Sequence, residues 1–131
     1  MPIICDTHIL LFDALAPQKL SRRAAAAVGQ GEEERQLACC DITLWEIAML
    51  IAKQRIRVDC APERFMERLI QARRLTVLPV TPAIAALSQS DFLSHGDPAD
   101  RLIAATALVH RSTLITADEH LRNCPQLQTL W

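Results

Sequence analysis

Aromatic side chains are scarce in this sequence, which has three phenylalanines, two tryptophans and no tyrosine. Proteins that hold single-stranded nucleic acid often stack its bases on several exposed aromatic rings. The scarcity of rings therefore predicts that this chain has no such platform. Strong positive charge is missing as well, because the 131 residues have a formal net charge of −1. This excludes a protein that wraps duplex DNA by charge alone, but not an enzyme of nucleic acids with a local basic rim.

Long hydrophobic runs are also missing. No segment approaches the roughly 18 apolar residues that a membrane-spanning helix requires. The N-terminus has no basic stretch before its first apolar run and no cleavage-like site, so we expect no secretory signal. The five cysteines, an odd number with no C-x-x-C pair, are predicted to be buried, reduced thiols rather than zinc ligands. These features predict a cytoplasmic protein.

Short apolar runs alternate with longer helical patterns along the chain. The predicted strands cover residues 2–5, 37–40, 76–80 and 114–116, with 127–130 as a further edge strand. The predicted helices cover residues 7–14, 20–29, 43–53, 62–72, 82–89, 98–110 and 118–122. Gly29 and Gly31 are expected to end the second helix, and Glu32, Glu33 and Glu34 to form a solvated loop. The alternation indicates one α/β domain over residues 1–131, with a parallel sheet covered on both faces.

Four acidic residues stand where an apolar segment gives way to a turn or a helix start: Asp6, Glu46, Asp100 and Asp118. Carboxylates in apolar settings are costly unless something pairs with them. Asp6 and Asp118 follow predicted strands, and the carboxyl ends of parallel strands share the rim where ligands bind. Glu46 and Asp100 lie on apolar helix faces, which point them towards the sheet. Four converging carboxylates would repel one another and would require a cation.

Each of these acids also has a purely structural interpretation. Asp6, Asp97 and Asp118 can each cap the helix that follows. Thr43 and Glu46 fit a capping box, in which Glu46 would only bond a backbone amide. The joint pattern nevertheless favours a site, because several independent coincidences would otherwise be needed.

The cation that fits such a site is Mg²⁺ or Mn²⁺, which takes oxygen ligands in an octahedral shell. A few carboxylates usually bind the ion, and water molecules fill its other coordination positions. A bound divalent ion lowers the pKa of its water and neutralises charge on phosphoryl oxygens. The acidic pattern therefore predicts metal-dependent hydrolysis of phosphodiester bonds, through one ion or two.

Four segments of the chain, in order, resemble the PIN-domain nucleases, and in particular the VapC-type toxins of bacterial toxin–antitoxin pairs. These segments are residues 6–11, beginning Asp-Thr-His; residues 44–48, Leu-Trp-Glu-Ile-Ala; residues 95–104, which include Asp-Pro-Ala-Asp-Arg; and residues 114–118, ending Thr-Ala-Asp. The resemblance implies a three-layer α/β/α sandwich with a central, mainly parallel sheet of four or five strands. It also implies a homodimeric, Mg²⁺-dependent endoribonuclease that cleaves RNA, and a cognate antitoxin whose tail covers the site.

The resemblance assigns metal binding and catalysis to four acids: Asp6, Glu46, Asp100 and Asp118. It places Asp97 in the same acidic patch and makes Thr7 and Thr116 groups that orient carboxylates. Arg101 matches a family position, and on physical grounds it could pair with Asp97 or meet a substrate phosphate.

Three further interpretations concern partners and residues outside the acidic set. The first helix and the helix of Trp45 could form a groove for an antitoxin peptide. The basic pairs at residues 22–23 and 73–74 could contact an RNA backbone. His8 and His95 lack a nucleophile partner at a recognisable spacing, which argues against either as a general base.

Other classes fit the sequence less well. A phosphoacceptor receiver domain needs paired acids near its first strand and a lysine after its last core strand. This chain has one aspartate after the first strand and Ala117-Asp118 after the fourth. A haloacid-dehalogenase-like phosphatase needs Asp-x-Asp, which Asp6-Thr7-His8 lacks. A non-catalytic PIN-like interaction module stays open as an alternative, although the intact set of four acids favours an enzyme.

Overall fold

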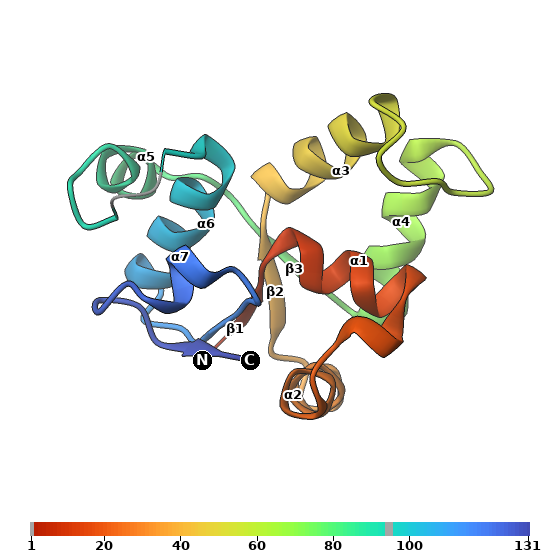
Figure 1. Ribbon diagram of the computed structural model, residues 1–131, viewed down its shortest axis with the longest axis horizontal. Coiled ribbons are helices and arrows are strands. Elements are labelled where there is room, and N and C mark those ends of the chain that lie inside the picture. The colour runs from red at the N-terminus through yellow and green to blue at the C-terminus, as the bar shows by residue number, and fades with distance from the viewer. Residues whose placement is uncertain (1, 94–95) are drawn as a thin grey trace.

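In the computed structural model, which describes residues 2–93 and 96–131, a five-stranded sheet forms the centre of the molecule (Figure 1). The strands are β1 (Ile3–Cys5), β2 (Leu37–Cys40), β3 (Thr76–Leu78), β4 (Leu114–Ile115) and β5 (Thr129–Leu130). Their order is β3-β2-β1-β4-β5, and every neighbouring pair is parallel. The predicted parallel sheet is therefore confirmed, although all its strands except β2 are shorter than predicted.

The strand order reverses between β1 and β4. The chain moves outward from β1 to β2 and β3, and then returns to place β4 on the other side of β1. Cys5, the last residue of β1, is in register with Ile115, the last residue of β4. The residues that follow, Asp6 and Thr116, consequently emerge side by side. In open parallel sheets, such a reversal is where ligands bind, beyond the carboxyl ends of the strands.

Helices cover both faces of the sheet (Figure 1). On one face lie α1 (Thr7–Leu15), α2 (Arg22–Glu33), α3 (Ile42–Ala52) and α4 (Pro62–Arg73). The other face carries α6 (Pro98–Val109) and α7 (Glu119–Arg122), with α5 (Pro82–Ser88) beside α6. A short 3-10 turn, η1 (Pro17–Lys19), follows α1 and was not predicted. The arrangement is the three-layer α/β/α sandwich that the resemblance implied.

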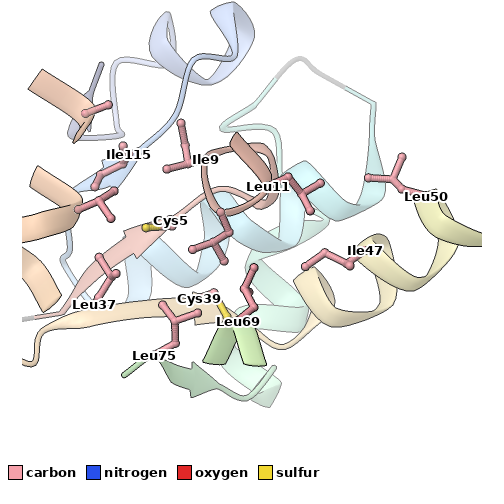
Figure 2. Close-up of a cluster of buried hydrophobic side chains, with 13 residues drawn as sticks. Cys5, Ile9, Leu11, Leu37, Cys39, Ile47, Leu50, Leu69, Leu75 and Ile115 are labelled. Carbon is pink, nitrogen blue, oxygen red and sulfur yellow. The ribbon is translucent and has the colours of Figure 1, made fainter. Parts of the chain in front are cut away.

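Two hydrophobic cores fill the spaces between the layers, because alternate residues of each strand point to opposite faces of the sheet. The core on the side of α1–α4 is shown in Figure 2, and its strand residues are Cys5, Leu37, Cys39 and Ile115. The strand residues of the core on the side of α6 and α7 are Ile4, Ala38, Cys40 and Leu114. These strands are apolar on both faces, which explains why the sequence shows continuous apolar runs there.

The five cysteines are free thiols, of which four are buried and Cys60 is half-buried. This confirms the prediction of reduced thiols, and it corrects the expected burial for Cys60. Among residues 2–93 and 96–131, no helix combines the length and the apolar character that crossing a lipid bilayer requires. Residues 94 and 95 belong to a predicted loop, and residue 95 also begins one of the four motif segments; both lie outside the described residues.

The end of α2 differs from the sequence-based prediction. Gly29 and Gly31 lie inside the helix, which continues to Glu33. Gly31 is buried, and a Cβ atom there would lie 3.0 Å from Cδ1 of Leu37. Gly31 thus allows α2 to approach β2 closely, so a residue expected to stop the helix serves its packing instead. The chain turns only at Arg35, which has a φ of 56°.

The two glycines of α2 should respond differently to alanine. Around Gly29 nothing lies within 4 Å of the added Cβ, so Gly29→Ala should raise the free energy of unfolding by about 0.5–1 kcal/mol through the better helix propensity of alanine. Gly31→Ala should gain less or lose stability, because its Cβ crowds Leu37. Urea unfolding of both variants measures the difference, and equal gains would show that α2 does not pack as described.

Candidate functional site

A pocket of about 390 Å³ opens beyond the carboxyl ends of β1 and β4. Its lining residues are Asp6, His8, Phe12, Glu46, Asp97, Asp100, Ala117 and Asp118. Five of these eight side chains are carboxylic acids. The structure thus brings together the four acids that the sequence predicted to converge, and Asp97 joins them.

Asp6 is held at the end of β1 by two hydrogen bonds. Its Oδ1 atom caps α1 by accepting from the backbone N–H of His8 at 3.2 Å. Its Oδ2 atom accepts from the hydroxyl of Thr116 at 2.6 Å, across the junction of β1 and β4. The Thr116 oxygen also accepts from the backbone N–H of Asp118 at 3.0 Å, so one threonine links the two acids. Capping and convergence are therefore compatible, and Thr116 makes the contact that the predicted orienting role requires.

Glu46 contributes a buried carboxylate to the pocket. Its side chain is buried, and among the described residues its Oε1 atom has no hydrogen-bond partner. The predicted capping box is wrong, because the Thr43 hydroxyl lies 3.0 Å from that of Thr7 and so joins α3 to α1. The residue at the N-cap position of α3 is Asp41, and its carboxylate accepts instead from the backbone N–H of Val80. Glu46 is therefore free of the structural role that the sequence allowed it.

The start of α6 supplies two acids of the pocket, Asp97 and Asp100, which lie close to Glu46. Asp97 caps this helix as predicted, because its Oδ1 atom accepts from the backbone N–H of Asp100 at 3.1 Å. One carboxylate oxygen from each of Glu46, Asp97 and Asp100 lies within 4.8 Å of the others. Oxygens at such separations can share one cation. Asp6 and Asp118 border the same pocket but lie outside this group, whereas Asp97, whose role was left uncertain, is inside it.

The comparison with known families agrees with this geometry. The model of the PIN domain matches residues 3–126 of the chain. The chain belongs to the PIN-domain family.

Known PIN-domain relatives resemble the chain over almost its whole length. "Ribonuclease VapC22" of Mycobacterium tuberculosis (strain ATCC 25618 / H37Rv) is 33% identical over 132 residues, which cover 98% of each chain. Among solved structures, a VapBC2 complex from Rickettsia felis bound to a fragment of its promoter DNA has a TM-score of 0.70 at 19% identity, covering 99% of this chain and 98% of that one. A toxin–antitoxin complex from Klebsiella pneumoniae has a TM-score of 0.64 at 22% identity, covering 98% and 96%. These two likenesses support the fold of the PIN domain.

Burial makes the acidic pocket of this PIN domain electrostatically costly. Desolvation raises the pKa of Asp6, while the hydrogen bond from Thr116 works in the opposite direction. Desolvation also raises the pKa of Glu46; a hydrogen bond with Thr7 lowers it, and the charge of Asp6 raises it further. The N-terminal ends of α1 and α6 point their partial positive charges at this region and offset part of the cost. The raised pKa values show that the offset is incomplete.

Arg101 has a role that neither predicted alternative described. Its guanidinium donates to the backbone carbonyls of Ser88 at 2.6 Å and Leu93 at 2.6 Å, and to that of Ser90. These bonds fasten the segment after α5 to the first turn of α6. Arg101 was expected to pair with Asp97 or to meet a substrate phosphate, whereas its described bonds hold backbone next to the acids. The planar fork of arginine suits several carbonyls at once.

Replacing Glu46 by glutamine should stabilise the fold in a buffer without divalent cations. The change removes a buried charge and keeps the shape of the side chain, so the free energy of unfolding near neutral pH should rise by about 0.5–2 kcal/mol. Because the pKa of Glu46 is raised from 4.5 on folding, the folded protein keeps this proton to a higher pH than the unfolded chain. The gain should therefore be smallest below about pH 4 and grow as the pH rises.

Urea unfolding near pH 4 and near pH 7.5 measures this gain. Glu33→Gln, at an exposed position of α2, is the matched control and should leave stability almost unchanged at both pH values. A Glu46→Gln variant that is no more stable than wild type near neutral pH would contradict the description of Glu46 as a buried acid whose charge is only partly compensated.

Proposed function

We propose that this protein is a metal-dependent endoribonuclease that hydrolyses RNA and acts as the toxin of a toxin–antitoxin pair. The observation that carries the proposal is the buried carboxylate of Glu46 beside Asp97 and Asp100, one oxygen of which has no hydrogen-bond partner within residues 2–93 and 96–131. Support for the substrate comes from the relative named Ribonuclease VapC22. Support for the toxin role comes from the toxin–antitoxin complexes with the same fold.

The donor set fits Mg²⁺ or Mn²⁺. The five acids that line the pocket offer hard oxygen ligands, and these two ions prefer such ligands. The buried Oε1 atom of Glu46 has no partner in the described part of the chain, and buried charges in proteins are usually paired or bound to a metal. Glu46, Asp97 and Asp100 would hold the ion closely, with Asp6 and Asp118 completing the acidic lining. When bound, the ion would supply an activated water and would neutralise charge on the scissile phosphate.

The residues of the chain itself contribute position and rigidity. Thr116 fixes the carboxylate of Asp6, and the N-cap bond fixes one oxygen of Asp97. Each hydrogen bond limits the rotamers that these acids can adopt. The side chains therefore lose less conformational entropy when an ion and a phosphate bind. Asp6, Glu46, Asp100 and Asp118 are the acids that we assign to catalysis and metal binding. We add Asp97 to the proposed metal ligands, because one of its oxygens lies close to oxygens of Glu46 and Asp100.

Exposed features outside the pocket suit the partners that we propose. Trp45, on α3 and next to Glu46 in sequence, is 59% exposed rather than part of the core. An indole at this place could receive an apolar residue of an antitoxin tail that covers the site. We also propose a homodimer acting in the cytoplasm, as the family resemblance implied.

The proposed basic contacts with RNA need one correction. Arg73 donates to Asp13 at 2.7 and 2.6 Å and to Glu32 at 2.5 Å, so its charge is already used to join α4 to α1 and α2. Arg22 and Arg23 are exposed, as is Arg74, and they stay candidates for the RNA backbone.

Cleavage of RNA in the presence of Mg²⁺ or Mn²⁺ tests this proposal. Asp100→Asn and Asp6→Asn should each lower kcat/KM by about 100-fold or more, because each removes a charge from the acidic pocket. Thr116→Val should cost about 10–100-fold, as expected for a group that orients a carboxylate. Asp59→Asn, at an exposed position outside the pocket, is the matched control and should keep full activity.

Two results would refute the enzyme. Cleavage that persists in chelator would show that no metal is needed. Cleavage that persists in both aspartate variants would show that the acidic pocket is not the active site. A wild-type protein that cleaves no RNA with either ion but still binds an antitoxin would favour the alternative of a non-catalytic PIN-like module. The receiver-like alternative is less well supported, because it needs a lysine after the last core strand and the segment that follows β4 here is Thr116-Ala117-Asp118.

A further inference from the structure

The acidic pocket is lined by two rings as well as by carboxylates. His8 and Phe12 lie one turn apart on α1, both line the pocket, and their ring centroids are 6.3 Å apart with an interplanar angle of 57°. The ammonium of Lys19 lies 5.6 Å from the centroid of the Phe12 ring. We call these three residues the ring wall. The low aromatic count predicted no stacking platform, but the i, i+4 spacing after Asp6 was the signal that could have revealed this wall.

The ring wall is not explained by the packing of the protein. Within the described chain, Phe12 belongs to neither of the two hydrophobic cores, whereas its neighbour Leu11 is part of the first. The His8 side chain is 54% exposed. A large apolar ring that borders an open, highly acidic pocket gains little there from burial.

We propose that Phe12, with His8 beside it, stacks one unpaired base of the RNA strand next to the scissile phosphate, and that Lys19 contacts the strand's backbone. This inference rests on the proposed function. His8 and Phe12 line the same pocket as the carboxylates, so we place a base next to a phosphate held through a cation at Glu46, Asp97 and Asp100 against Phe12. A base presents a ring face to the wall only when it is unstacked, which makes the flanking nucleotide an unpaired one.

Charge supports the same arrangement. The pocket lining includes five acids, so a polyanion entering it meets repulsion wherever no cation stands. Lys19 places a positive charge on the aromatic side of the pocket, against the ring that would hold the base. Its long flexible stem lets the ammonium move from the ring to a phosphate oxygen without a change in the backbone.

Base deletion in the substrate tests the stacking contact. Wild-type protein with Mg²⁺ is given a single-stranded RNA oligonucleotide and versions with an abasic ribose on either side of the mapped cleavage position. At one of these positions kcat/KM should fall about 10-fold for wild type, as expected for the loss of one base–aromatic stack. Phe12→Leu, which keeps the apolar volume, should abolish this discrimination, and Phe12→Met should do the same. Phe12→Trp should retain it.

The matched controls are Leu15→Ala, on the same helix as Phe12, and Lys53→Gln, for comparison with Lys19. Leu15→Ala removes an exposed apolar side chain near the end of α1 and should keep the discrimination of wild type. Lys19→Gln should make kcat/KM less dependent on salt, with the slope against log salt concentration reduced by about 0.7 for one lost phosphate contact on a single strand. Lys53→Gln, exposed at the end of α3, should leave the slope unchanged.

The outcomes separate this inference from the proposed function. Suppose that wild type cleaves RNA with metal, and that Phe12→Leu and Phe12→Met distinguish the intact from the abasic RNA as well as wild type does. The stacking role is then overturned, whereas the proposed nuclease stands. The same holds if wild type itself ignores both abasic positions. If wild type cleaves no RNA under any metal condition, both proposals fall together.

Discussion

The mutual repulsion of carboxylates gathered at one edge of the sheet is the constraint that organises this molecule. Glu46, Asp97 and Asp100 bring oxygens within 4.8 Å of one another, and Asp6 and Asp118 border the same pocket. Hydrogen bonds from backbone amides and from Thr116 offset part of this cost, as do the ends of α1 and α6. Burial first, and the charge of neighbouring acids second, still raises the pKa of Asp6 and of Glu46, so part of the cost is left. A cation is the simplest partner that removes it.

The fold provides the framework on which this repulsion can be tolerated. The reversal of strand order between β1 and β4 makes Asp6 and Thr116 neighbours although 110 positions separate them in the chain. Two separate cores, one on each face of the sheet, fix the helices that bring in the other acids. Arg101 adds a local brace, because it ties the segment after α5 to the turn that carries Asp97 and Asp100. The free energy gained by packing the two cores thus offsets the destabilisation that the buried acids of the site cause.

Much of this arrangement was predictable from the sequence, because the signals were local. Buried strands such as 37–40 appear as continuous apolar runs, and Asp97 before Pro98 marks a helix start whatever the surroundings. The predictions failed where tertiary contacts decide. Gly31 lies within α2 because it packs on Leu37, and Thr43 bonds Thr7 instead of capping its own helix. No local pattern reveals that Arg101 binds the carbonyls before it. The single domain, the cytoplasmic location and the chemical role of each acid stay predictions.

Diffraction from crystals soaked in Mn²⁺ tests the central claim most directly, because anomalous scattering locates the ion independently of activity. The account predicts a strong anomalous peak in the pocket, at bonding distance from carboxylate oxygens of Glu46 and the first turn of α6. A pocket without such a peak at saturating Mn²⁺, with the Glu46 carboxylate bonded to amides or hydroxyls of the protein instead, would contradict it.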